Sequence, residues 1–294
     1  MLDVIFDTDP GKDDAFALFL ALAVPDRLNL LALLASAGNL GLDVTSAAAR
    51  RILEASGRPE IPVYRGCPRP LLRPLVTIPE HHGVDGLGGS GLPPMRDPPE
   101  TTHAVAALIN LIDRAERPLI LAAIAPLTNI AVAFAMRPDL PGKLGGLVIM
   151  GGAAGTGNMT AHAEFNIFND PHAAAIVFAS GAPITLVPLD VTRPTLPDAA
   201  WFEKLADQGA PGRAIANMWR DKPMPLHDVV VTAHLLWPEL FTVERCRLEV
   251  EVNDVRLMGK TAIAPAGDGS ANVVTEIDRE RLYCALETTL SNYK

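Results

Sequence analysis

The sequence has few cysteines, and their spacing fits neither a disulfide framework nor a paired metal motif. Cys67, Cys246 and Cys284 are the three cysteines among 294 residues, and long stretches of chain separate them. An odd number of cysteines without a CxxC pair is typical of proteins kept in a reducing compartment. The first residues also lack a basic region followed by an apolar segment and a cleavage site. We therefore expect a cytoplasmic protein.

Basic runs and long apolar runs are also missing. The chain carries 25 Lys and Arg against 34 Asp and Glu, a net charge of −9, with no Lys/Arg-rich run. This balance argues against a nucleic-acid partner but does not oppose the binding of a cation. The longest uncharged apolar runs, such as residues 15–25, are too short to span a bilayer, so we expect no membrane segment.

Two common nucleotide-binding loops are absent. No GxxxxGK[ST] phosphate loop occurs, and the glycine-rich segment 151–157 lacks the GxGxxG spacing. The chain is nevertheless 49% apolar, so it can bury a large core. A nucleotide cofactor is therefore not expected, although a well-packed enzyme or binding protein is.

Short apolar runs alternate with helical segments along most of the chain. The expected strands are at 4–6, 28–36, 61–64, 119–123, 147–150 and 184–189, with helices between them. This alternation predicts an α/β fold with a single open, mostly parallel, Rossmann-like sheet and helices on both faces. Strands at 247–253, 256–264 and 272–277 predict an antiparallel C-terminal extension, closed by a helix at 278–291. No linker divides the chain, so we expect one domain over residues 1–294.

Four carboxylates lie within eight residues near the start of the chain. Asp7 and Asp9 follow an expected strand, and Asp13 and Asp14 precede an expected apolar helix at 15–24. Anions this close repel one another unless a cation or free water reaches them. Because every nearby ligand atom is oxygen, a hard divalent ion suits the stretch best. The alternative is that Asp13 or Asp14 caps the helix while the other acids are solvated.

Further polar residues stand at expected strand ends and helix starts. Asn39 follows the second strand, and His81-His82 occupies the middle of a Pro- and Gly-rich loop at 62–99. His227-Asp228 precedes a late apolar helix. Position alone leaves turn and capping roles open for each of these residues.

These segments, in this order, resemble the nucleoside hydrolase family, whose members include inosine-uridine preferring and pyrimidine types that cleave the N-glycosidic bond of ribonucleosides. The likeness runs from residue 3 to about 240 and more loosely through the tail. The segments that carry it are DTDPGKDD at 7–14, Gly38-Asn39, His82-Gly83, PLTN at 126–129, MGG at 150–152, EFN at 164–166 and His227-Asp228.

The resemblance implies a Ca²⁺ site and a division of roles among these residues. It implies calcium held by Asp9, Asp14, Asp228 and the backbone carbonyl of Ile124, with Asp9 also acting as general base. His227 matches a position that, in some members, protonates the departing base. The substrate-binding residues that it implies are Asn39, Asp13, His82, Met150, Asn158, Glu164 and Asn166, of which Asn39 also belongs to the catalytic group.

The expected reaction is attack of an activated water on C1′ of the ribose, with inversion and an oxocarbenium-like transition state. The family usually forms homodimers or homotetramers, and the choice between purine and pyrimidine bases stays open. Lys12, Ala125 and Val229 depart from common family residues. Two alternatives are a calcium-dependent ribose- or nucleoside-binding protein without turnover and a Mg²⁺-dependent phosphatase with Asp7 as nucleophile.

Overall fold

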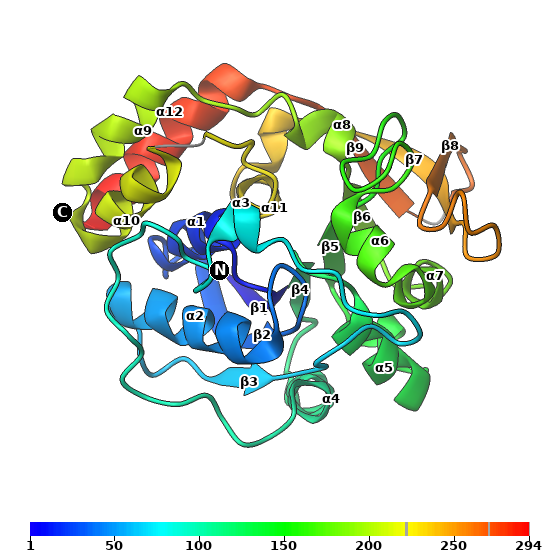
Figure 1. Ribbon diagram of the computed structural model, residues 1–294. Helices are drawn as coiled ribbons and strands as arrows, with labels where there is room; N and C mark the ends of the chain where they lie inside the picture. Colours follow the sequence, from blue (N-terminus) through cyan, green and yellow to red (C-terminus); the bar gives the residue numbers. More distant parts are fainter. Residues whose placement is uncertain (221–222, 270, 294) are drawn as a thin grey trace.

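One nine-stranded sheet organises the chain (Figure 1). The computed structural model describes residues 1–220, 223–269 and 271–293. In sheet order the strands are β3 (Val63–Arg65), β2 (Leu28–Ala35), β1 (Leu2–Thr8), β4 (Ile120–Ala123), β5 (Gly146–Met150), β6 (Ile184–Val187), β9 (Ala271–Ile277), β7 (Phe241–Val250) and β8 (Thr261–Pro265). The first seven of these strands are parallel to one another, whereas β7 pairs antiparallel with β9 and β8.

Helices cover both faces of this sheet. The α-helices are α1 (Lys12–Leu22), α2 (Leu42–Ala55), α3 (Pro79–His82), α4 (Ala104–Arg114), α5 (Thr128–Met136), α6 (Phe165–Asn169), α7 (Pro171–Phe178), α8 (Leu189–Thr192), α9 (Ala199–Lys204), α10 (Gly209–Trp219), α11 (Val229–Leu236) and α12 (Arg279–Leu290). Val4 and Phe6 of β1 face a core with α1, α2, α10, α11 and α12, while Ile5 faces a second core with α4, α5 and α7. The predicted α/β class and its two covered faces are confirmed.

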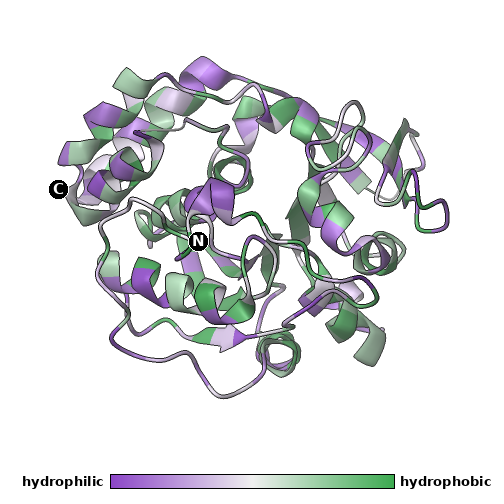
Figure 2. Ribbon diagram, in the orientation of Figure 1, coloured by the Kyte–Doolittle hydropathy of each residue, from purple (hydrophilic) through white to green (hydrophobic). Residues whose placement is uncertain are grey.

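Helix α1 is the central helix of the larger core. All its residues from Asp13 to Leu22 are buried, because it contacts β2 and the helices α2, α10, α11 and α12. A helix that is apolar on every side is stable only when protein surrounds it. Helix α2 contrasts with it, since polar and apolar segments alternate along its ribbon (Figure 2) and its inner residues Ala48 and Ile52 are fully buried.

The C-terminal part differs in detail from the prediction. Strand β7 begins at Phe241, six residues before the expected start at 247. The strand expected at 256–264 begins later, at Thr261, and is shorter than expected. Residues 254–257 form a turn instead, in which Leu257 N–H donates to the Asp254 carbonyl at 3.0 Å and Arg256 N–H donates to the Asp254 side chain at 2.9 Å. Strand β9 pairs parallel with β6 and belongs to the main sheet, so the antiparallel extension consists of β7 and β8.

Among the described residues, none of the helices has the length and apolar character needed to cross a membrane.

Candidate active site

The predicted site residues gather at the carboxyl ends of the parallel strands. Because β1, β2, β4 and β5 all end at this edge, the segments that follow them meet there, as ligand sites in open α/β sheets do. A cavity of about 540 Å³ opens at this edge. Ten of the predicted residues line it: Asp13, Asn39, His82, Ile124, Met150, Asn158, Glu164, Asn166, His227 and Asp228.

Three carboxylates form a group suited to a cation. Asp13, Asp14 and Asp228 each offer one oxygen, and these oxygens lie within 4.8 Å of one another. The residues meet although they are far apart in the sequence, because α1 packs on α11 and the Thr232 hydroxyl donates to the Ala17 carbonyl at 3.1 Å. Asp14 and Asp228 of the predicted calcium ligands therefore meet, and the third member of this group is Asp13 rather than the predicted Asp9.

Asp14 is held by several donors at the N-terminus of α1. Its Oδ1 accepts from the Thr8 hydroxyl at 2.6 Å, and its Oδ2 accepts from Gly11 N–H at 2.9 Å and from the Asn39 side-chain amide at 3.1 Å. The bond from Gly11 is a helix-capping contact, so Asp14 caps the helix and also belongs to the carboxylate group. The capping alternative and the cation alternative are compatible for this residue.

Asp9 is immediately beside this carboxylate group, and a hydrogen bond holds one of its two carboxylate oxygens. Asn39 N–H donates to its Oδ2 at 2.6 Å, while its buried Oδ1 has no hydrogen-bond partner among the described residues. A Cβ at Gly38 would lie 2.0 Å from Asp9 Oδ2, so only glycine allows this approach. Asn39 thus positions Asp9 and leaves one carboxylate oxygen available.

Burial dominates the electrostatics of the acids. It raises the pKa of Asp9, Asp14 and Asp228, and it raises the pKa of Asp13 to about 7. Repulsion from neighbouring carboxylates raises the pKa of Asp9, Asp13 and Asp228 further. Several buried anions this close favour either a shared proton or a bound cation.

Asp7 belongs to a different environment. The side-chain amide of Asn129 donates to its Oδ2 at 2.9 Å, and burial raises its pKa to about 7. It is not among the described residues that line the cavity. Asp7 therefore connects β1 to the start of α5, away from the cavity surface.

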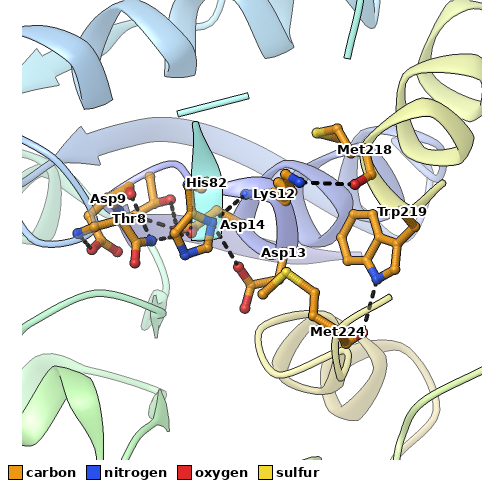
Figure 3. Close-up of polar contacts among 11 residues, drawn as sticks. Thr8, Asp9, Lys12, Asp13, Asp14, His82, Met218, Trp219 and Met224 are labelled. Atoms are coloured by element: carbon orange, nitrogen blue, oxygen red, sulfur yellow. Dashed lines mark hydrogen bonds and ion pairs between the residues drawn. The ribbon is translucent and has the colours of Figure 1, made fainter. Parts of the chain in front are cut away.

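The two adjacent histidines differ sharply. His82 is 3% exposed, and its Nδ1 accepts from Lys12 N–H at 3.1 Å and lies 4.0 Å from Asp13 Oδ1 (Figure 3). A Cβ at Gly11 would lie 2.4 Å from the same ring nitrogen. His81 is exposed. The α3 turn buries His82 against the first turn of α1, and its side chain lines the cavity.

Polar residues after β5 form another side of the cavity. Glu164 accepts from the backbone N–H groups of Gly152, Asn166 and Ile167 at 2.9–3.1 Å, and burial raises its pKa to about 7. The Asn166 side chain donates to the Met150 carbonyl at 3.3 Å. Asn158 Oδ1 accepts from Phe165 N–H at 2.9 Å, which orients it in the same loop.

His227 lies half-buried at the cavity, at the position that the resemblance assigns to protonation of the departing base. Its Nδ1 is 2.8 Å from the Thr192 hydroxyl. Burial, together with the positive charge of Arg193, lowers the pKa of His227 to about 4, so its surroundings disfavour the charged ring.

Sequence reasoning missed part of the cavity. Thr8 carried no signal beyond its place between two acids, yet its hydroxyl contacts Asp14. Pro223, Met224 and Pro225 also line the cavity, together with Met159 and Phe165, and none of them was among the predicted site residues. Nothing in the local sequence pattern indicates which surface such a segment covers.

Comparisons with known proteins identify the family. The family model for inosine-uridine preferring nucleoside hydrolase matches residues 4–284. The chain is 37% identical to the pyrimidine-specific ribonucleoside hydrolase RihA of Citrobacter koseri, with 99% of each chain covered. It is 38% identical to the enzyme of the same name from Shewanella sp. (strain MR-7), covering 99% of this chain and 96% of that protein.

Solved structures show the same relationship. The purine-preferring ribonucleoside hydrolase from Gardnerella vaginalis superposes with a TM-score of 0.93 at 28% identity, covering 99% of this chain and 98% of the other. A plant nucleoside hydrolase superposes with a TM-score of 0.90 at 30% identity, covering 99% of both chains. Because these relatives are hydrolases of nucleosides, the two alternative functions, a phosphatase with Asp7 as nucleophile and a binding protein without turnover, are rejected. The chain belongs to the inosine-uridine preferring nucleoside hydrolase family and is a ribonucleoside hydrolase.

Proposed function

We propose that this enzyme is a calcium-dependent hydrolase of pyrimidine ribonucleosides, such as uridine and cytidine. The observation that carries the proposal is the convergence of Asp13, Asp14 and Asp228 at a cavity lined by both polar and apolar residues. The names of the Citrobacter and Shewanella relatives support pyrimidine bases.

The donor set fits calcium. Its side-chain donors are carboxylate oxygens, and the buried Oδ1 atoms of Asp9 and Asp13 have no hydrogen-bond partner among the described residues. We assign Asp14 and Asp228 as ligands with Asp9 and the carbonyl of Ile124, and Asp13 stands close enough to contribute. When bound, the ion would compensate the negative charge of these acids and attract further oxygen ligands, such as water and the ribose hydroxyls.

Asp9 is the general base in this proposal. Asn39 holds its Oδ2, so its Oδ1 remains to accept a proton from the attacking water. The water oxygen bonds to C1′ as the C1′–N bond breaks, and the bonding electrons leave with the nucleobase. Asp9 accepts one proton of the water and later releases it to solvent, while the nucleobase takes up a proton from solvent, so the products are ribose and the neutral nucleobase. Attack by a single water opposite the base implies inversion at C1′.

The other polar residues bind and stabilise the ribose. Asp13, Asn158, Glu164 and Asn166 present carboxyl and amide groups toward the cavity that they line. Such groups accept hydrogen bonds from the sugar hydroxyls and stabilise the positive charge that develops on the ring. His227, held by Thr192, would contact the leaving base as a hydrogen-bonding group.

A substrate panel tests the proposal. The purified enzyme is incubated with uridine, cytidine, inosine, adenosine and 2′-deoxyuridine, and released sugar is measured by a reducing-sugar assay. We expect uridine and cytidine to be hydrolysed with the highest kcat/KM, chelation to abolish turnover and added Ca²⁺ to restore it. Because the ion and Asp13 act on the ribose hydroxyls, 2′-deoxyuridine should be a poor substrate.

Equal kcat/KM for uridine and inosine would contradict the pyrimidine preference. Full activity after exhaustive chelation would contradict the calcium requirement, and comparable turnover of uridine and 2′-deoxyuridine would contradict recognition of the diol.

A further inference from the structure

Part of the apolar lining of the cavity is a short segment without secondary structure. Pro223, Met224 and Pro225 line the cavity together with Met159 and Phe165. A nucleoside has a polar sugar and a flat base, and the acids and amides of the cavity suit the sugar. The apolar residues therefore suit the face of the base, on which a methionine sulfur makes favourable contacts. This reasoning rests on the proposed function.

Trp219 holds the segment Pro223–Pro225 in place through a hydrogen bond. Its indole N–H donates to the Met224 carbonyl at 2.9 Å (Figure 3), and its ring is fully buried. The ring stacks on Phe202 at 5.3 Å between centroids and makes an edge contact with Phe16 at 5.8 Å. Phe16 lies in α1, two residues after Asp14. Trp219 therefore contacts both the segment Pro223–Pro225 and the helix that carries Asp13 and Asp14.

Lys12 provides a second connection to the same region. Its ammonium group donates to the Met218 carbonyl at 3.1 Å, at the C-terminal end of α10, where a positive charge is favourable. Its backbone N–H donates to His82. Lys12 thus joins the first turn of α1 to the residue that precedes Trp219 (Figure 3).

We propose that Trp219 and Lys12 are positioning residues that hold Met224 against the nucleobase and so determine the affinity for the base half of the substrate. Neither residue takes part in bond cleavage. Their effect reaches the substrate through the backbone at residues 218 and 224.

The substitution Trp219→Phe tests this proposal, because it keeps an aromatic ring against Phe202 and removes only the N–H donor. We expect KM for uridine to rise about fivefold, the effect of one lost hydrogen bond, with kcat changed less than twofold. The inhibition constant of free ribose should stay within twofold of the wild type, since free ribose has no base for Met224 to contact. Lys12→Met should change KM in the same direction, and Trp237→Phe, at the far end of α11, is the matched control.

A KM for uridine within twofold of the wild type in both variants would overturn the proposal. A parallel rise in the ribose inhibition constant would also overturn it, because that result indicates general damage to the site. Should Trp219→Phe not fold, Lys12→Met alone decides between these outcomes. Absence of turnover by the wild-type enzyme would instead overturn the proposed function.

Discussion

At the scale of single residues, the site depends on side chains that are fixed on one side and available on the other. Asp9 is the clearest case, with one oxygen held by Asn39 N–H and the other without a partner among the described residues. His227 follows the same pattern, since Thr192 holds one ring nitrogen. Such one-sided anchoring orients a group and keeps an atom for the substrate.

The substitution Asp9→Asn should lower kcat for uridine by about 100-fold or more, because an amide cannot accept the proton of the attacking water. Asp26→Asn, at an exposed acid beyond α1, is the control and should leave kcat unchanged. The measurement is steady-state kinetics at saturating Ca²⁺. A kcat for Asp9→Asn within tenfold of the wild type would show that another group is the base.

The substitution His227→Ala should lower kcat for uridine more than for 4-nitrophenyl riboside, because nitrophenolate leaves without a proton. The ratio of the two kcat values, measured on one enzyme preparation, corrects for any change in metal or ribose binding. Equal losses on both substrates would exclude a role for His227 at the leaving group.

At the scale of elements, the ends of helices carry the chemistry and their packing sets the distances. The first turn of α1 and the N-terminus of α11 bring Asp13, Asp14 and Asp228 together, and the Thr232 hydroxyl connects the two helices. Helix α6 begins at Glu164, whose carboxyl group caps its first N–H groups. Capping and ligand binding therefore use the same backbone positions.

The pKa of Glu164 predicts how the metal-free enzyme responds to pH. Burial raises it from 4.5 to about 7, so the folded state holds this proton more tightly than the unfolded state does. Its contribution to stability is fully present below pH 4.5 and is lost as the pH rises toward 7, by roughly 3 kcal/mol at most. We expect the free energy of unfolding in chelator to fall between pH 5 and 7.5, and to fall less in Glu164→Gln.

Denaturant titrations at both pH values provide the measurement. The same decline in Glu164→Gln and in the wild type would show that Glu164 does not hold the proton. Glu249→Gln, at a side chain exposed on β7, is the control and should decline as the wild type does.

At the scale of the whole molecule, the site links distant parts of the chain, so a bound cation should stabilise the entire fold. Calcium at 100 times its dissociation constant should add about 2.7 kcal/mol to the free energy of unfolding and raise Tm, because the assembled carboxylates exist only in the folded state. The substitution Asp228→Asn should remove most of this gain. Thermal melts with Ca²⁺ and with chelator test both statements, and equal Tm values for the wild type in the two conditions would contradict them.

Much of the fold was predictable because most of the parallel strands are apolar runs with a helix after them. The location of Asp9, Asn39 and Met150 at strand ends followed from the same pattern. The contacts within the site were not predictable in this way. The proximity of Asp13 to Asp14 and Asp228 depends on side-chain orientation in the first turn of α1, and the low pKa of His227 depends on enclosure by residues distant in sequence.

Strand β9 lies between β6 and β7 although it follows both in the chain. During synthesis on the ribosome, the edge of β6 therefore stays unpaired until residue 271 and those after it emerge. A chain that stops before this point would expose that edge, and open edges readily recruit strands of other molecules. Premature termination before codon 271 should thus yield an aggregating product as well as an inactive one.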